Sequence, residues 1–243
     1  MDWKVKFLEL TIRLISWPMK REVTGTENVP RDRGFIAVSN HNSFTDGLFL
    51  PQVLVTAIGK PSHFISYAEL FDIRVIGTVL RWGQGIFLDR KNKEGVEKAL
   101  ADAKQWIAKG ECVGIFPEAH IAKPERMGIA RPGAALLALE TGCDVLPCGM
   151  IGAEKVWPRR GRFRPRWNAV TIHIGEPVGF REYCGAYAEG TDEEKKVIIT
   201  GVSTLIMREV AELAGKEYTY GDDSVDRLPG FARAVDTRGA DTG

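Results

Sequence analysis

The sequence lacks the features that mark several large classes of protein. It has no run of about 18 apolar residues, so a membrane-spanning helix is not expected. Its four cysteines form no C-x-x-C pair and no zinc-type spacing, which predicts no disulfide framework, no metal site and a reducing compartment. The absence of G-x-S-x-G, P-loop and G-x-G-x-x-G motifs argues against serine hydrolases, nucleotide hydrolases and dinucleotide-dependent enzymes, so no cofactor is expected.

An excess of charge of one sign is also missing. The 243 residues carry 33 Lys and Arg against 32 Asp and Glu, a formal net charge of +1, and 44% of them are hydrophobic. Such a composition is typical of a globular chain long enough to bury a full core. It argues against a dedicated nucleic-acid-binding protein.

The balanced total hides a basic N-terminal segment. Residues 1–21 contain five cations and two anions, and apolar side chains recur there at steps of three and four: Trp3, Phe7, Leu10, Leu14 and Trp17. This spacing predicts an amphipathic helix that ends at Pro18. Two interpretations remain open, a helix packed on the core or a helix lying in a membrane interface. No small-residue cleavage site follows, so a signal peptide is not expected.

Two further segments have a biased composition. Residues 155–167 mix six cations with aromatic residues and prolines, which is typical either of a loop that binds phosphates or lipid headgroups or of a solvated surface loop. From Lys216 onward the chain is acidic and rich in Gly, Asp and Ala. We therefore expect an N-terminal amphipathic helix in 1–24, a main domain in 25–215 and a loosely ordered polar tail in 216–243.

Apolar runs alternate with helical patterns between these ends. The predicted strands span 34–40, 63–67, 85–88, 112–116, 145–150 and 169–174, and the predicted helices span 45–57, 92–109, 132–141 and 192–214. This alternation indicates an α/β fold, with a mainly parallel sheet flanked by helices. Because ligands bind beyond the carboxyl ends of such strands, the site is expected just after residues 39, 88 and 116.

Side chains capable of acid–base chemistry follow the first of these strands. His41 is the natural general base, since histidine is the side-chain type whose unperturbed pKa lies near neutrality. Asp46 can accept the proton of one imidazole nitrogen, which leaves the other nitrogen free. Five residues along an ideal helix place two side chains on different faces, so the pair requires His41 in a loop and Asp46 in the first helical turn, with Ser43 or Thr45 as the N-cap. An ordinary surface loop is the alternative interpretation.

Four short motifs, in order, resemble the signatures of the glycerolipid acyltransferase family. They are Asn40-His41-x-Ser43-x-x-Asp46, Gly85-Ile-Phe-Leu-Asp89-Arg90, Phe116-Pro117-Glu118 and Val145-Leu146-Pro147. The resemblance covers roughly residues 25–180. It implies that the main domain is the acyltransferase domain of that family. It also implies transfer of a fatty acyl group from acyl-CoA or acyl carrier protein, as co-substrate, to a lipid hydroxyl.

The resemblance also implies roles for these residues. His41 and Asp46 would be catalytic, and no Ser or Cys nucleophile is needed because the acceptor hydroxyl attacks the thioester directly. Asn40, Ser43 and Gly85 are expected in the substrate-binding site. Asp89 and Arg90 would position the acceptor, and Glu118 would order the acceptor side. The expected partners are the thioester donor, a lysophospholipid acceptor and a membrane surface, with the chain peripheral or monotopic on the cytoplasmic face.

Two positions depart from the family pattern. Ile121 stands where the third signature usually has an arginine, and Ala68 stands where a lysine often precedes Glu-Leu-Phe. Lys123, Arg126 or Arg131 can supply replacement charge, and Arg131 is included in the expected binding site. The first expected acceptor is 1-acylglycerol-3-phosphate, giving phosphatidic acid. A different lipid or alcohol acceptor, thioester hydrolysis, and a catalytically silent membrane-binding module are the alternatives.

Overall fold

Residues 1–229 are described by a computed structural model, and its elements follow one another as strands alternating with helices. The strands are β1 (Lys20–Thr24), β2 (Phe35–Ser39), β3 (Ser62–Tyr67), β4 (Ile86–Leu88), β5 (Cys112–Ile115), β6 (Val145–Ile151) and β7 (Val170–Ile174). The α-helices are α1 (Trp3–Ser16), α2 (Asp46–Ile58), α3 (Ala68–Phe71), α4 (Arg74–Trp82), α5 (Lys93–Ala108), α6 (Gly133–Thr141), α7 (Arg181–Glu189), α8 (Asp192–Leu213) and α9 (Asp222–Asp226). Three single-turn 3₁₀ helices are η1 (Trp17–Met19), η2 (Thr26–Asn28) and η3 (Ala153–Lys155).

One seven-stranded sheet organises the described part of the chain. Its spatial order is β1-β7-β6-β2-β5-β3-β4, and every neighbouring pair is parallel except β6 and β7. All five residues of β2 are buried, because this central strand is covered on both faces. The predicted α/β fold with a mainly parallel sheet is confirmed.

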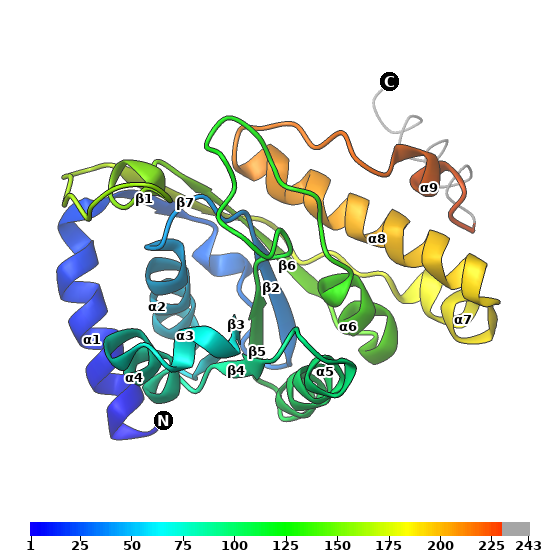
Figure 1. The fold of residues 1–243 in the computed structure, drawn as a ribbon, viewed down its shortest axis with the longest axis horizontal. Coiled ribbons are helices and arrows are strands. Elements are labelled where there is room, and N and C mark those ends of the chain that lie inside the picture. The colour runs from blue at the N-terminus through cyan, green and yellow to red at the C-terminus, as the bar shows by residue number, and fades with distance from the viewer. Residues whose placement is uncertain (230–243) are drawn as a thin grey trace.

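Helices cover both faces of the sheet (Figure 1). The helices α1 to α4 lie on one side, and α5, α6, α7 and α8 lie on the other. Each side has its own apolar cluster. One joins the sheet to α5, α6 and α8 through residues such as Ala103, Leu137 and Met207, and the other joins it to α2 through residues such as Leu50 and Leu54. Burial of these clusters is the main stabilising contribution to the fold.

The structure corrects three details of the sequence interpretation. β1 was not predicted, because Lys20–Thr24 is an edge strand of mostly charged residues without a clear apolar alternation. It joins the sheet, so the expected helical segment 1–24 ends inside the main domain. α7 was not predicted either. The tail is ordered as far as residue 229, since Val225 and Leu228 are buried against the domain, whereas 230–243 lie outside the described residues.

The helix predicted at the N-terminus is present as α1. Its apolar stripe faces outward, with exposed fractions of 64% for Trp3, 67% for Leu14 and 74% for Trp17. The opposite side packs on α2 and α4, while the largely exposed rings of Trp3 and Phe7 also contact Trp82 of α4. No helix in residues 1–229 is long and apolar enough to cross a membrane. The exposure of these large apolar side chains makes the stripe a candidate interaction surface.

Candidate active site

The candidate site lies at the carboxyl ends of β2 and β5, which are neighbours in the sheet. β2 ends at Ser39 and is followed by the loop 40–45, and β5 is followed by Phe116, Pro117 and Glu118. Because parallel neighbours end at the same edge, the first and third motifs meet in space. The structure thus brings together segments that are more than 70 residues apart in the sequence.

His41 and Asp46 form a hydrogen-bonded pair. His41 Nδ1 lies 3.0 Å from Asp46 Oδ2, with His41 in the loop and Asp46 at the first position of α2, as the spacing requires. The Asp46 side chain is fully buried, whereas that of His41 is 20% exposed. An ionised carboxylate only accepts hydrogen bonds, so Nδ1 carries the proton and Nε2 keeps its lone pair. The His41 ring stacks on Phe116, which fixes its plane.

Asp46 is held by the backbone of its own loop. Its Oδ2 atom also accepts hydrogen bonds from the backbone N–H groups of Asn42, at 2.7 Å, and Ser43, at 2.8 Å. Its Oδ1 atom has no hydrogen-bond partner among the described residues. The three donors on Oδ2 fix the carboxylate against His41. Thr45 is the N-cap residue of α2, one of the two expected candidates, but its side chain makes no capping hydrogen bond.

Asn40 and Ser43 are buried and tie the loop to distant strands and turns. Asn40 Nδ2 donates to the carbonyl of Met150, and Asn40 Oδ1 accepts from the N–H of Met150, both across β6. Ser43 Oγ donates to the carbonyl of Trp157, which anchors the basic segment 155–167 beside the first motif. In the structure both side chains position the loop. Direct contact with substrate stays a prediction.

Glu118 is hydrogen-bonded to the backbone of His41. Its Oε1 accepts the backbone N–H of His41 at 2.8 Å, and its Oε2 accepts the N–H of Gly128 at 2.5 Å. Burial raises the pKa of the Glu118 carboxyl, while these two hydrogen bonds and the charge of Lys216 act in the opposite direction. Glu118 therefore clamps the His41 backbone to the loop after β5. Its predicted role on the acceptor side remains a prediction.

We expect the Glu118→Ala variant to be destabilised by about 3 kcal/mol, because the backbone N–H groups of His41 and Gly128 lose the buried carboxylate that accepts them. Urea unfolding followed by circular dichroism measures the effect. The matched control is Glu125→Ala, an exposed glutamate of the same loop, which should change stability by less than about 0.5 kcal/mol. Equal stability of the two variants would contradict the view that Glu118 holds the backbone of His41 in place.

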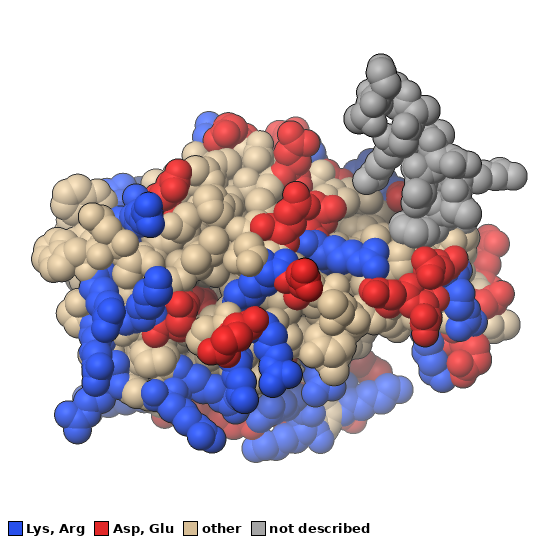
Figure 2. Space-filling model, turned by 90° about the horizontal axis from the view of Figure 1, so that it is seen from above, with Lys and Arg blue, Asp and Glu red and all other residues tan. Residues whose placement is uncertain are grey.

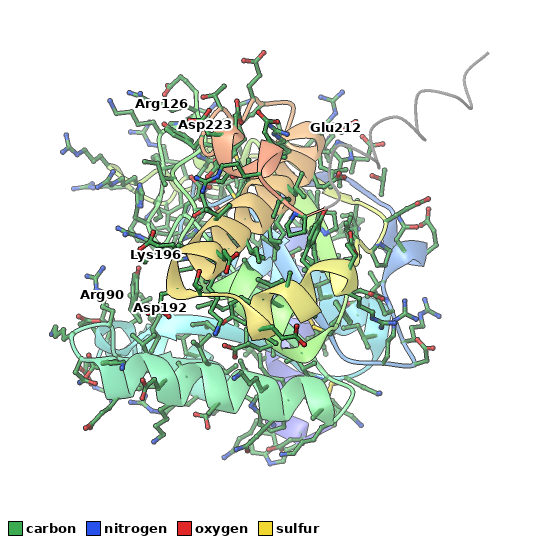
Figure 3. The ribbon with its side chains drawn as sticks, turned by 90° about the vertical axis from the view of Figure 1, so that its right-hand side faces the viewer. Arg90, Arg126, Asp192, Lys196, Glu212 and Asp223 are labelled. Atoms are coloured by element: carbon green, nitrogen blue, oxygen red, sulfur yellow. The ribbon has the colours of Figure 1, made fainter. Side chains whose placement is uncertain are left out.

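The second motif lies at β4, two strands beyond β5 in the sheet. The Arg90 guanidinium sits 4.2 Å from the ring centre of Tyr67, whose hydroxyl donates to the carbonyl of Ala119 at 2.6 Å. Tyr67 was missed by sequence reasoning, since nothing in the sequence links it to Arg90. Asp89 accepts from the backbone N–H of Lys91, so it shapes its own turn, and Gly85 lies in the turn before β4. Arg90 projects outward on the same side of the molecule as Arg126 (Figure 3).

The two positions that depart from the family pattern lie shortly after the third motif and at the start of α3. Ile121 is buried beside the loop after β5, and Ala68 is the first residue of α3. The side chains of Lys123, Arg126 and Arg131 are exposed on the segment between β5 and α6. The backbone N–H of Arg131 donates to the carbonyl of Pro117, so this cation follows the third motif closely.

Groups outside this site offer little additional chemistry. Residues 1–229 contain no cluster of three or more His, Cys, Asp or Glu side chains placed to hold a metal ion. Burial raises the pKa of the Cys148 thiol to about 12, so the reactive thiolate form is suppressed. His63 is fully buried, stacked on Trp106 and hydrogen-bonded to Glu111, as expected for a structural histidine.

Comparison with known families matches residues 20–151 to the Acyltransferase family. This stretch contains all four motifs and the whole of β6, and it covers more than half of the chain. The chain belongs to the Acyltransferase family, and the resemblance drawn from the four motifs is confirmed.

Two relatives are similar to this chain over more than half of its length. A chloroplast 1-acyl-sn-glycerol-3-phosphate acyltransferase of Brassica napus is 32% identical over 160 residues, covering 65% of this chain and 45% of the relative. A probable 1-acyl-sn-glycerol-3-phosphate acyltransferase of Mycoplasma pneumoniae is 28% identical over 140 residues, covering 56% and 50%. The chain thus spans about half the length of these relatives.

A solved structure resembles most of the chain. The crystal structure of the 1-acyl-sn-glycerophosphate acyltransferase PlsC from Thermotoga maritima matches with a TM-score of 0.59 and 26% identity. The match covers 88% of this chain and 81% of that one. It covers a larger share of the chain than the family match does.

Proposed function

We propose that this protein transfers a fatty acyl group from acyl-CoA or acyl carrier protein to the hydroxyl of a lysophospholipid. The first candidate acceptor is 1-acylglycerol-3-phosphate, which would give phosphatidic acid. The observation that carries the proposal is the His41–Asp46 pair, with Nδ1 bonded to a buried carboxylate and Nε2 free on a partly exposed ring. Family membership and the printed names of the relatives support the same reaction.

The reaction needs one base and no covalent enzyme intermediate. His41 Nε2 takes the proton of the acceptor hydroxyl while its oxygen attacks the thioester carbonyl carbon. The imidazolium that forms is stabilised by Asp46. When the tetrahedral intermediate collapses, the carbon–sulfur bond breaks and the leaving thiolate takes the proton from His41. The products are an ester and a free thiol, and His41 returns to its starting form.

Incubation of the protein with radiolabelled palmitoyl-CoA and a panel of lysolipids tests the proposal. The expected product is labelled phosphatidic acid with 1-acylglycerol-3-phosphate as acceptor. Free fatty acid as the sole product would contradict the proposal and favour thioester hydrolysis. Absence of any product, with vesicle binding retained, would favour a silent membrane-binding module.

A different acceptor is the second candidate. Its specific support is Ile121, a buried apolar side chain where the third signature usually has an arginine. The exposed cations Arg90 and Arg131 follow the second and third motifs and are the proposed phosphate contacts in the first candidate. If Arg90 and Arg131 do not bind an acceptor phosphate, the expected products of the acceptor panel are esters of a neutral lipid or alcohol.

We also propose that the protein works as a peripheral or monotopic enzyme on the cytoplasmic face of a membrane. The outward apolar stripe of α1 continues to Trp17 at the start of η1, and the N–H of Asn168 donates to the carbonyl of Pro18 in the same turn. The neighbouring Trp167 is 77% exposed. Basic side chains gather at the left and lower part of the face in Figure 2, and acidic ones towards the right. Tryptophans beside cations are typical of a surface that meets lipid headgroups.

The basic segment 155–167 adds to this surface. It lines a hollow of about 250 Å³ whose walls include Arg160, Arg162, Arg164 and Arg166. Clustered guanidinium groups bind phosphates well. The segment therefore supports the headgroup-binding interpretation, and its bond to Ser43 places it next to the dyad.

Changing Trp3 and Trp17 together to Ser should lower co-sedimentation with anionic phospholipid vesicles about tenfold, because two interfacial anchors are lost. Val96→Ser, which removes an exposed apolar side chain from α5 on the other side of the sheet, should leave binding unchanged. If the double variant sediments as the wild type does, α1 is a helix of the core only.

A further inference from the structure

Lys216 lies outside the stretch matched to the family, yet its side chain reaches the first motif. Its Nζ donates to Asn42 Oδ1 at 2.7 Å, a contact between residues 174 positions apart. The helix α8 carries the chain from Asp192 to near Glu212 at the opposite end (Figure 3), and the chain then turns back beside the loop between β5 and α6 (Figure 1). Sequence analysis assigned Lys216 to a loosely ordered tail.

The turn that aims Lys216 is well defined. The N–H of Lys216 donates to the carbonyl of Ala211, and the N–H of Gly215 donates to that of Glu212. These two bonds, with Gly215 at φ +63°, form a Schellman motif, which requires the left-handed conformation that glycine adopts without strain. Two residues later, Tyr218 is buried and its hydroxyl accepts the N–H of Ala130. Lys216 is thus fixed from both sides.

Lys216 faces carboxylates from several elements. The charges of Glu118, Glu154, Asp46 and Glu125 act on its ammonium and favour the protonated form, against partial burial, which lowers the pKa of Lys216. Asp46 is fully buried with one oxygen unpartnered, and Glu118 is fully buried as well. A buried negative charge requires a compensating positive group, and Lys216 lies where it can provide one.

The contact partner of Lys216 connects it to the dyad. Asn42 Oδ1 accepts from Lys216 Nζ and from Asn40 Nδ2, and Asn42 Nδ2 donates to the carbonyl of Lys123. The backbone N–H of Asn42 donates to Asp46 Oδ2, the atom that holds His41 Nδ1. A continuous set of hydrogen bonds therefore runs from Lys216 through Asn42 and Asp46 to His41.

We propose that Lys216 is a positioning residue for the His41–Asp46 dyad. Its ammonium holds Asn42 in place and offsets the negative charge of Asp46 and Glu118, so that the imidazolium form of His41 is not overstabilised in the resting enzyme. This inference rests on the proposed function for its kinetic consequence. Its electrostatic part concerns only the resting protein.

The test compares Lys216→Met with the wild type. Without the cation, the two carboxylates stabilise the imidazolium more strongly, so the titration midpoint of His41, followed by NMR and assigned with His41→Ala, should rise by about 0.5 to 1 pH unit. The acid limb of the pH profile of kcat should move by the same amount. At pH 7, kcat should fall by no more than about tenfold, while KM changes less than about twofold.

Two further variants separate the charge from the fold. Lys216→Arg should restore the NMR midpoint and most of kcat, whereas Lys98→Met, an exposed lysine of α5, should change neither. Unchanged NMR midpoints in a folded Lys216→Met protein, or a raised midpoint retained in Lys216→Arg, would overturn the inference. Because the NMR readout needs no substrate, a wild type that transfers no acyl group would refute the proposed function without deciding the role of Lys216.

Discussion

The Asp46→Asn variant is expected to lose about 10³-fold in kcat while keeping its fold. Opposite charges about 4 Å apart interact by about 4 kcal/mol in a partly buried site, and this attraction to the imidazolium is what the substitution removes. The hydrogen-bond geometry can survive, because two backbone N–H groups and His41 Nδ1 all converge on one oxygen of residue 46. An amide oxygen can take that place, which keeps the tautomer of His41 correct.

Thermal unfolding separates this electrostatic effect from damage to the structure. The Asp46 carboxylate is fully buried and one of its oxygens has no hydrogen-bond partner among the described residues, so neutralising it removes a costly buried charge. We therefore expect a Tm within a few degrees of the wild type. Asp46→Ala removes the acceptor as well and should be less active and less stable than Asp46→Asn. Equal kcat in the wild type and Asp46→Asn would show that Asp46 does not stabilise the imidazolium.

The placement of His41 beside Asp46 could be predicted from the sequence because it follows from local rules. A strand ending at residue 39 and a helix starting near 45 leave only a short loop for His41 and place Asp46 in the first turn. The structure has this arrangement, with β2 ending at Ser39 and α2 beginning at Asp46. The order of the four motifs then placed Glu118 at the same sheet edge. Each of these inferences depends on elements adjacent in the chain or on parallel strand ends.

The parts that could not be predicted depend on contacts between distant segments. Lys216 reaches Asn42 because of the direction of α8 and the turn at Gly215. The acidic, glycine-rich composition of this segment gives no indication of that contact. The bond from Ser43 to the carbonyl of Trp157 is equally invisible, since backbone acceptors carry no sequence signal. Periodicity also cannot tell whether the apolar stripe of α1 faces the core or the surroundings.

The edge strand β1 is another element that could not be predicted from the sequence. β1 pairs in parallel with β7, and three of its five residues are exposed, as expected for a strand at the edge of a sheet. Its charged residues resemble those of the preceding basic helix, so the composition led us to assign both to one N-terminal segment. Tertiary pairing decides the state of such a segment, because intrinsic strand preference is weak.

The central claim is that His41 is the general base, and the most direct measurement is the rate of acyl transfer by His41→Ala. General-base catalysis contributes about 10²- to 10⁴-fold, so we expect kcat with palmitoyl-CoA and the accepted lysolipid to fall about 10³-fold. KM should change little, since His41 acts on the proton in the transition state. His63→Ala provides a histidine control: it is destabilising but leaves the dyad intact, so its folded fraction should keep near wild-type kcat.

The fold of His41→Ala should be preserved. Its backbone N–H can still donate to Glu118, and the lost ring was partly exposed. The measurement is therefore made on a protein whose circular dichroism matches that of the wild type. A fall of about 10³-fold in kcat is the result this mechanism predicts. Transfer at the wild-type rate by the folded His41→Ala protein would contradict it.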